Sequence, residues 1–429
     1  MKHRRTLTAV ALISVLMLVA ASCSKSSTSN TPSGSANHPS FDLKIGDIVA
    51  LSGDLATYGP PIDKGARVAI DQINAALEAA GLSDTITVEI VATEDEQTDA
   101  KASVEDATKL VQTDHVNMIM GPLGSTDTES VATSVTVPGS ILQITPSGTD
   151  PAITNLQDDG WVWRTAPSDL AQAHLLVNTM ADAFGADATI NTGARNDAYG
   201  TGLQGAFEDS WKANGGTIGQ SVTWNPEAAT FDTEAQKVAS GSPDGWLIVD
   251  FPGTYAKVGP ALVRTGNWDP TKTFVTDGLR DATLPKVAGT EATEGLRGTS
   301  PTTAPTDPAT AFDAVFKQTA PTKVDRGTFD VNAFDAVMVA FLAALKAGSS
   351  DPTAIRDNLI AVSGPPGTAY TFSELGQAIT DILAGKDVDY QGASGPIDFT
   401  AEGDPAGLYD VYSYTNGKIV VDQTAVAQS

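Results

Sequence analysis

The sequence predicts an α/β protein made of two Rossmann-like, doubly wound lobes, and two observations lead to this fold class. Short apolar runs alternate with segments of helical hydrophobic spacing from Phe41 onward. The alternation forms two successive series, which separate near residue 166. Because strand-helix alternation gives parallel sheets with helices on both faces, two series indicate two such lobes.

The first series is expected to supply four strands and three helices. Residues 62, 66, 73 and 77 are apolar and recur at the spacing of one helix face. The expected strands cover 43–51, 85–92, 116–120 and 141–145, and the expected helices cover 62–77, 98–113 and 127–136.

The second series repeats this order, and the end of the chain is mainly helical. A helix over 168–184 opens the series, with strands over 188–193, 217–223, 246–251 and 273–276 and helices over 202–213, 231–239 and 255–265. After residue 300 we expect helices over 308–318, 329–347, 351–361 and 372–384, and strands over 395–399, 408–414 and 418–421.

The N-terminus has the pattern of an export signal with a lipid-attachment site. Three basic residues in the first five positions precede the apolar stretch Leu7–Ala21, and small residues lead up to Cys23. This order is typical of a secretory signal. A cysteine at the cleavage site resembles a bacterial lipobox, so we expect residues 1–22 to be removed and Cys23 to carry lipid. The alternative is an ordinary secretory signal with an incidental cysteine.

Composition narrows the classes of partner. Residues 23–40 are rich in Ser, Gly and Pro and predict a flexible tether. Three of the 26 basic residues lie in the signal, which leaves 23 against 52 acidic residues, a net charge of −29. Such a charge argues against nucleic acid or an anionic lipid surface as a partner. No second apolar stretch approaches the roughly 20 residues that span a bilayer, so the lipid is expected to be the only membrane contact.

Three loops of the first series are rich in hydroxyl groups and glycine. They are Ser52–Pro61, Gly121–Thr128 and Thr145–Pro151, and each follows an expected strand. In open parallel sheets, ligands bind beyond the carboxyl ends of the strands. Each loop alone is explained by helix caps and turns. Three such loops in one topological position predict a shared site for a carboxylate-type anion.

A set of motifs gives the chain a resemblance to a known family. In order, they are LSGDLATYGPPIDKGARVAIDQINAA from 51, IMGPLGSTDT from 119, QITPSGTDPAIT from 143, WRTAPSD from 163, ARNDAYGTGL from 194, FVTDGLRDATLP from 274 and DYQGASGPIDFTAEGD from 389. Together they resemble the periplasmic leucine/isoleucine/valine-binding family of ABC transporter receptors.

The resemblance implies a type I periplasmic binding protein fold. In that fold two Rossmann-like lobes are joined by three crossovers and close like a hinge on a small ligand. It assigns 41–166 plus 298–394 to lobe 1, and 167–297 plus 395–429 to lobe 2. The implied partners are a small, amino-acid-like ligand and the permease and ATPase subunits of an ABC importer. We expect a monomer on the outer face of the cell membrane.

The same resemblance implies roles for six residues. Ser125 matches a donor to the ligand carboxylate, Thr149 a contact of both carboxylate and amine, and Ser147 a position used through its backbone. Tyr58 and Tyr199 match aromatic residues of the first and second lobe beside the ligand. Asp277 lies where the family places the acid that pairs with the ligand ammonium.

The chain departs from the family pattern at the second lobe. The family acid is often glutamate, so Asp277 shortens its reach by one carbon. The loop 249–255 aligns loosely where amino-acid receptors carry an aromatic residue. Phe251 or Tyr255 could supply it, and Thr254 is a further candidate for ligand contact. The sequence leaves open whether Asp250 or Arg280 reaches the ligand.

Catalytic and cofactor patterns are weak in comparison. Residues 200–205 read GxGxxG, but six residues separate them from the end of the expected strand at residue 193, so a loop presenting Tyr199 is the preferred interpretation. The acid pair Glu94/Asp95 fits a solvated strand end better than glycosidase chemistry. We therefore expect no catalytic residue, no metal and no cofactor. A sensory binding protein and an exported hydrolase are the alternatives to the transport receptor.

Overall fold

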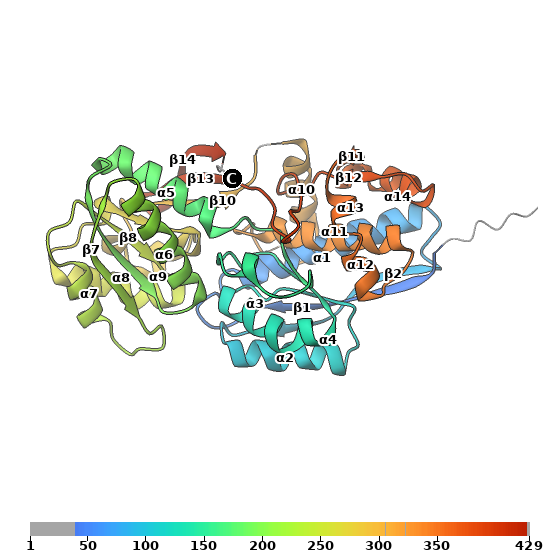
Figure 1. Cartoon of the computed structure of the whole chain (residues 1–429), viewed down its shortest axis with the longest axis horizontal. Helices are drawn as coiled ribbons and strands as arrows, with labels where there is room; N and C mark the ends of the chain where they lie inside the picture. The colour runs from blue at the N-terminus through green and yellow to red at the C-terminus, as the bar shows by residue number, and fades with distance from the viewer. Residues whose placement is uncertain (1–38, 305, 322, 427–429) are drawn as a thin grey trace, which may run out of the picture. The chain divides into compact units, whose positions relative to one another are not determined.

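The computed structural model describes residues 39–304, 306–321 and 323–426. The expected signal over 1–22, Cys23 and most of the expected tether lie outside the described residues. The described chain is built on two large sheets, and Figure 1 shows helices on both sides of each. In the part of the chain that the structure covers, no helix is both long and apolar enough to cross a bilayer.

The first lobe has a five-stranded, fully parallel sheet in the order β2-β1-β3-β4-β5. Its strands are β1 (Phe41–Val49), β2 (Ile86–Asp95), β3 (Met118–Met120), β4 (Leu142–Thr145) and β5 (Val162–Arg164). Its helices are α1 (Gly59–Ala79), α2 (Ala100–Gln112), α3 (Ser125–Val131), which continues as a π-helical turn over Ala132–Thr136, and α4 (Val137–Gly139).

The second lobe has a seven-stranded sheet in the order β14-β13-β10-β9-β8-β6-β7. The strands are β6 (Thr189–Arg195), β7 (Thr217–Trp224), β8 (Gly245–Val249), β9 (Thr273–Val275), β10 (Arg297–Thr302), β13 (Leu408–Thr415) and β14 (Lys418–Val426). The helices are α5 (Asp169–Phe184), α6 (Ala198–Ala213), α7 (Asp232–Val238), α8 (Pro252–Thr265) and α9 (Leu284–Ala288). Strands β7-β6-β8-β9-β10 are parallel and repeat the winding of the first sheet, while β13 and β14 join antiparallel.

The chain returns to the first lobe through a mainly helical segment. Its elements are α10 (Asp307–Gln318), α11 (Asp330–Ala347), α12 (Pro352–Arg356), α13 (Ile360–Ser363) and α14 (Leu375–Leu383), with β11 (Thr368–Tyr370) and β12 (Val388–Tyr390) in a small parallel sheet. Helix α11 is buried over almost its whole length and packs against α1. A helix surrounded by protein has no polar face, which explains its nearly continuous apolar sequence.

Alternating residues of the first sheet fill two separate cores. Ile45 and Val49 of β1 pack in a core with α1 and α11, whereas Ile48 packs in a second core with Leu110 of α2 and Val131 of α3. Successive side chains of a strand point to opposite faces, so the sheet is covered on both sides. Figure 1 shows α1 and α11 on one side of β1 and α2 and α3 on the other.

Three crossovers between the lobes confirm the predicted connectivity. The chain passes from β5 to α5, from β10 to α10, and from β12 to β13. Two of the expected lobe boundaries are misplaced. Strand β10 pairs with β9 and β13, so the chain leaves the second sheet after Thr302 rather than at residue 298. Residues 395–404 stay with the first lobe, because Asp404 and Gly403 bond to Arg164 of β5.

Several short elements differ from the expected ones. Strands β5, β11 and β12 have three residues each, too few for a readable period. Strand β10 contains Pro301, which argues against a central strand in a sequence pattern. The expected strand over 395–399 is wrong, because only an isolated bridge between Gln391 and Pro396 forms there. The expected helix over 351–361 is broken into α12 and α13.

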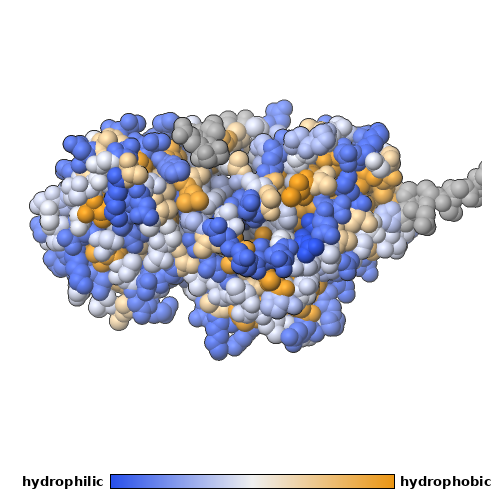
Figure 2. Space-filling model, in the orientation of Figure 1, coloured by the Kyte–Doolittle hydropathy of each residue, from blue (hydrophilic) through white to orange (hydrophobic). Residues whose placement is uncertain are grey.

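The surface in Figure 2 is mostly hydrophilic, with hydrophobic residues in small, separate patches. Single exposed apolar residues such as Leu170 and Ile360 are normal for a globular surface. The view in Figure 2 therefore gives no broad apolar face of the kind that marks an obligate interface.

Candidate functional site

The two lobes meet at the carboxyl ends of their parallel strands. The strand order reverses between β1 and β3 in one sheet and between β6 and β8 in the other, and these switch points favour ligand binding. A cavity lies between the loops that follow them. Its lining is Leu55, Tyr58, Leu123, Ser125, Ser147, Tyr199, Phe251, Asp277, Gly278 and Phe329. Five of the six residues assigned from the resemblance therefore meet at one place, although they come from distant parts of the chain.

Hydroxyl groups of the first lobe form one side of the site. Ser125 opens α3, and its Oγ accepts the backbone N–H groups of Thr149 at 3.3 Å and Asp150 at 3.2 Å. The hydroxyl group of Ser125 donates a hydrogen bond to no acceptor among the described residues. Thr149 does not line the cavity, but its Oγ1 is buried and unpaired in the described part of the chain. The hydroxyl of Ser125 can therefore donate to an oxyanion in the cavity, whereas that of Thr149 lies beside the carboxyl of Asp169.

Ser147 is held by its own loop. Its Oγ donates to the carbonyl of Leu123 at 3.0 Å, and its N–H points to Oγ1 of Thr145 at 3.3 Å. The side chain ties the loop after β4 to the loop after β3. This bond keeps Ser147 and Ser125 on the same wall of the cavity.

Asp277 and Tyr199 form the opposite, second-lobe wall. The hydroxyl of Tyr199 lies 3.0 Å from Oδ1 of Asp277 and 2.7 Å from Oγ1 of Thr276, and it accepts the N–H of Gly278 at 3.0 Å. Burial raises the pKa of the Asp277 carboxyl to about 6, although the hydrogen bond from Tyr199 and the nearby amide of Gln172 oppose the shift. No described Lys, Arg or His forms a salt bridge with Asp277, so the carboxylate lacks a cationic partner.

Asp169 is a second buried acid that the sequence analysis missed. It is the first residue of α5, is fully buried, and neither carboxyl oxygen has a hydrogen-bond partner among the described residues. Burial raises its carboxyl pKa well above the ordinary range and the charges of Asp277 and Asp150 raise it further, whereas the hydroxyl of Thr149 and the positive charge of Arg164 oppose the shift. The sequence does contain a signal for Asp169. It ends the segment Arg164–Asp169, and only one short strand separates this segment from the third hydroxyl-rich loop, 145–151.

Aromatic and aliphatic side chains close the remaining sides of the cavity. Tyr199 and Phe251 stack, with ring centroids 4.9 Å apart and planes 12° from parallel. Phe329 contributes a third ring from the residue before α11, where its backbone has a φ of 69°. A bulky residue in this left-handed region is rare and is held there only by its surroundings, a feature common at functional sites. Sequence reasoning missed Phe329 because no periodic pattern marks it.

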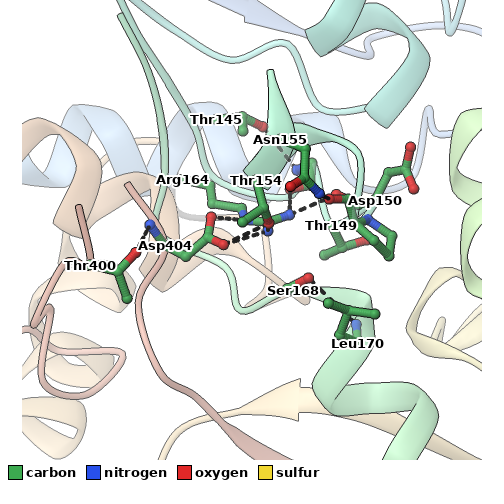
Figure 3. A network of polar contacts seen from close by, with 12 residues as sticks. Thr145, Thr149, Asp150, Thr154, Asn155, Arg164, Ser168, Leu170, Thr400 and Asp404 are labelled. Carbon is green, nitrogen blue, oxygen red and sulfur yellow. Dashed lines mark hydrogen bonds and ion pairs between the residues drawn. The ribbon is translucent and has the colours of Figure 1, made fainter. Parts of the chain in front are cut away.

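Arg164 braces the loop after β4 from behind (Figure 3). Its fully buried guanidinium binds Asp404 through two hydrogen bonds of 2.7 and 2.9 Å, and it donates to the carbonyl of Asp150 at 3.0 Å. Thr154 joins the same network through a 2.7 Å bond to Asp404. A paired, hydrogen-bonded charge of this kind fixes geometry, so the network holds the backbone next to Thr149 in place.

Other candidate residues lie away from the cavity. Thr254 is buried and donates to Asp54 at 2.5 Å, and Tyr255 donates to the carbonyl of Ala292 at 2.8 Å. Phe251, not Tyr255, is the aromatic residue in the cavity wall. Asp250 and Arg280 do not line it: Asp250 lies 3.8 Å from Arg195, and Arg280 binds Asp410 at 3.0 Å.

The cavity is closed around a space of about 20 Å³, enough for a single water molecule. Contacts between the lobes narrow it. Tyr58 Oη donates to the carbonyl of Asp277 at 2.9 Å, the N–H of Ala198 donates to Oγ1 of Thr126 at 2.9 Å, and Thr57 bonds to Asp281. A ligand can enter such a site only if the lobes separate.

Comparisons with known proteins agree with this architecture. The sequence model of the periplasmic binding protein family matches residues 42–402. The chain is 26% identical over 394 residues to the chemotactic signal transduction system substrate-binding protein BasB of Halobacterium salinarum, covering 88% of each chain. It is 28% identical over 324 residues to the Leu/Ile/Val-binding protein BraC3 of Rhizobium johnstonii, covering 74% of this chain and 84% of the relative.

Solved structures show the same fold. The leucine-binding protein LivK of Thermotoga maritima superposes with a TM-score of 0.73 at 20% identity, covering 90% of this chain and 99% of that one. LivJ of Streptococcus pneumoniae, solved with isoleucine, gives 0.72 at 22% identity, covering 90% of this chain and all of that one. Since the family model spans most of the chain and the lobes have the expected winding, the protein belongs to the periplasmic binding protein family and has its type I fold.

Proposed function

We propose that the protein is an extracytoplasmic solute receptor that binds one α-amino acid between its lobes. The observation that carries the proposal is a pair of buried acids, Asp277 in the cavity wall and Asp169 behind it, neither of which forms a salt bridge with a described Lys, Arg or His. An uncompensated charge is costly in the interior, so such acids favour a ligand that brings its own positive charge. Ser125 and Thr149 supply hydroxyl donors that suit the carboxylate of the same ligand.

The side chain of the ligand is proposed to be aliphatic and of moderate size. Leu55, Leu123, Phe251 and Phe329 line the part of the cavity that the polar groups leave. Apolar walls discriminate by shape and reject charge, so Leu, Ile and Val are the first candidates. The names of BraC3 and of a Pseudomonas aeruginosa relative that binds leucine, isoleucine, valine, threonine and alanine support this class.

A carboxylate without an amine is the main competitor. A Rhodopseudomonas palustris solute-binding protein of the same fold was solved with benzoate. The two acids argue against such a ligand here, because they would repel its carboxylate and remain unpaired. Tight binding of benzoate with no binding of amino acids would therefore overturn the roles given to Asp169 and Asp277.

Delivery of the ligand to the permease and ATPase subunits of an ABC importer is the proposed output. Residues 1–22 are proposed to direct export, and lipid on Cys23 to hold the mature, monomeric receptor at the outer face of the membrane. Replacing Cys23 by Ala should release the protein from the membrane fraction. A wild-type protein that carries no lipid would contradict the anchor and leave the receptor proposal intact.

A sensory role is the second candidate, and it rests on the likeness to BasB, which covers 88% of the chain. The same binding site would serve both roles. Deletion of the gene should abolish uptake of labelled ligand if the protein is a transport receptor. Loss of chemotaxis toward that ligand with normal uptake would favour the sensory role.

A thermal-shift screen tests the ligand class directly. The purified protein is mixed with amino acids, amides, polyamines, sugars and small carboxylates. A ligand at 100 times its Kd stabilises by about 2.7 kcal/mol, which gives a clear shift. Hits among aliphatic amino acids are expected. Hits confined to sugars or polyamines would reject the proposed site, and turnover of any hit would favour the hydrolase alternative.

A further inference from the structure

One loop of the first lobe reaches the ends of three strands of the second. The loop between β1 and α1 contacts Arg195 at the end of β6, the start of α8 beyond β8, and Asp277 and Asp281 beyond β9. At its tip lies Asp54, whose carboxylate is three-quarters buried. Most other residues that make contacts across the cavity have one partner in the opposite lobe, whereas Asp54 has three.

Asp54 supplies the cap that α8 lacks. Helix α8 begins after Phe251, which offers no side-chain cap, so its first N–H groups need acceptors from elsewhere. The N–H of Gly253 donates to the carbonyl of Asp54 at 3.3 Å, and Oγ1 of Thr254 donates to its Oδ2 at 2.5 Å. An acid at a helix N-terminus is also favoured by the helix dipole. Here the acid comes from the opposite lobe.

Arg195 links this contact to the wall of the cavity. Its Nη1 lies 3.2 Å from Oδ2 of Asp54, and its guanidinium stacks 3.9 Å above the ring of Phe251. Phe251 stacks on Tyr199, which holds Asp277. Asp197 and Asp250 keep Arg195 in the second lobe, so separation of the lobes would remove only Asp54 from its partners.

We propose that Asp54, Arg195, Gly253 and Thr254 form an interlobe latch that stabilises the closed form and retains the ligand. The identity of the retained ligand rests on the proposed function, whereas the effect of the latch on closure does not. Gly253 sets how closely the lobes approach, because a Cβ at this position would lie 2.4 Å from Oδ1 and 2.7 Å from Cα of Asp54. Only glycine allows the observed contact.

Gly253→Ala tests the latch by steric exclusion. Alanine stabilises a helix relative to glycine, so α8 itself should not suffer. Gly205→Ala is the matched control, since Gly205 lies inside α6 and a Cβ there would have no described atom within 4 Å beyond its own helix turn. Spin labels at exposed Lys101 in α2 and Lys212 in α6, in a background without Cys23, report the distance between lobes by pulsed electron resonance. Gly253→Ala should move the distribution toward open distances, and Gly205→Ala should not.

Asp54→Ala tests the polar part of the latch, with Asp209→Ala as control because Asp209 is 88% exposed. Asp54→Ala should open the lobes in the absence of ligand and raise the dissociation rate of leucine on the order of tenfold, with little change in the association rate. Circular dichroism and thermal unfolding check that each variant folds. Unchanged distances in both Gly253→Ala and Asp54→Ala would overturn the latch. If leucine does not bind, the ligand-free distances still decide, so failure of the latch and failure of the ligand assignment are distinguishable.

Discussion

The hydroxyl of Tyr199 lies 3.0 Å from Oδ1 of Asp277, and the two side chains share one wall of the interlobe cavity. The bond engages one carboxylate oxygen of Asp277. It also links the acid to an aromatic ring, which stacks on Phe251. Charge recognition and the shape of the apolar wall are thus connected through a single tyrosine.

Replacing Asp277 by Asn should weaken leucine binding. The amide keeps the size of the side chain but cannot neutralise an ammonium, so we expect a loss of roughly 2–4 kcal/mol of binding free energy. Tyr199→Phe should cost less binding free energy, about 1 kcal/mol, because Asp277 keeps its charge and loses one hydrogen bond. The same change leaves the N–H of Gly278 and the hydroxyl of Thr276 without this partner, so the stability of the variant is measured as well. Isothermal titration calorimetry measures both. Equal affinity of Asp277→Asn and the wild type for the true ligand would remove Asp277 from the site.

Asp169→Asn should separate stability from binding. A buried acid with a raised pKa destabilises the ligand-free fold increasingly as the pH rises above the ordinary pKa of a carboxyl, about 4, so Asn should increase the free energy of unfolding at pH 8 by roughly 1–3 kcal/mol. Loss of the favourable charge at the start of α5 would subtract at most about 1 kcal/mol. Leucine affinity should fall at the same time. A variant that is less stable than the wild type in urea would show that Asp169 has a structural partner.

The affinity of the protein for leucine should rise with pH between about 5 and 7. Burial raises the pKa of Asp277 from an ordinary 3.8 to about 6. The protonated acid therefore makes its full contribution to the free energy of unfolding below pH 4, and this contribution is lost as the pH rises through 6. An ammonium ligand prefers the ionised carboxyl, so binding releases a proton and strengthens about tenfold over this range. Asp169 and Asp277 interact and titrate together. Titrations in buffers of different ionisation enthalpy count the released protons, and a flat profile would contradict the assignment.

Ser125→Ala should lower both affinity and stability. Its Oγ accepts the N–H groups of Thr149 and Asp150, so the variant leaves two buried donors unpaired as well as removing a donor to the ligand. We expect a loss of about 1–3 kcal/mol in the free energy of unfolding. Ser125→Thr keeps the hydroxyl and serves as the control. Normal stability of Ser125→Ala would mean that water replaces the hydroxyl.

Asp404→Ala should destabilise the fold through Arg164. The guanidinium is fully buried, and removing its carboxylate partner leaves an uncompensated charge, which costs about 3–5 kcal/mol. Asp232→Ala is the control, because its ion pair with Arg264 is more than half exposed on both sides and contributes roughly 0–1 kcal/mol. Urea unfolding measures the difference. Similar losses in the two variants would show that the Arg164 network does not brace the site.

The expected residues differ in how far the sequence could define them. Ser125, Ser147 and Tyr58 follow buried parallel strands, and the carboxyl ends of such strands lie at one edge, so their meeting could be predicted from order alone. Phe329 could not be found in this way, because it comes from a segment that returns to the first lobe only after the chain has built most of the second. Thr254 shows the reverse error: it lies in the right loop, but its side chain turns to Asp54.

The sequence by itself determined the winding of each lobe, the loops that carry the site and most of its hydroxyl and aromatic residues, because hydrophobic period and loop composition are local properties. Only the tertiary structure decided which groups are left without partners and which residues bridge the lobes. Asp169 looks like an ordinary first-turn acid until its burial beside Asp277 is known. Asp54 and Arg195 are 141 residues apart, and their contact depends on the closure of one lobe on the other, which no local pattern encodes.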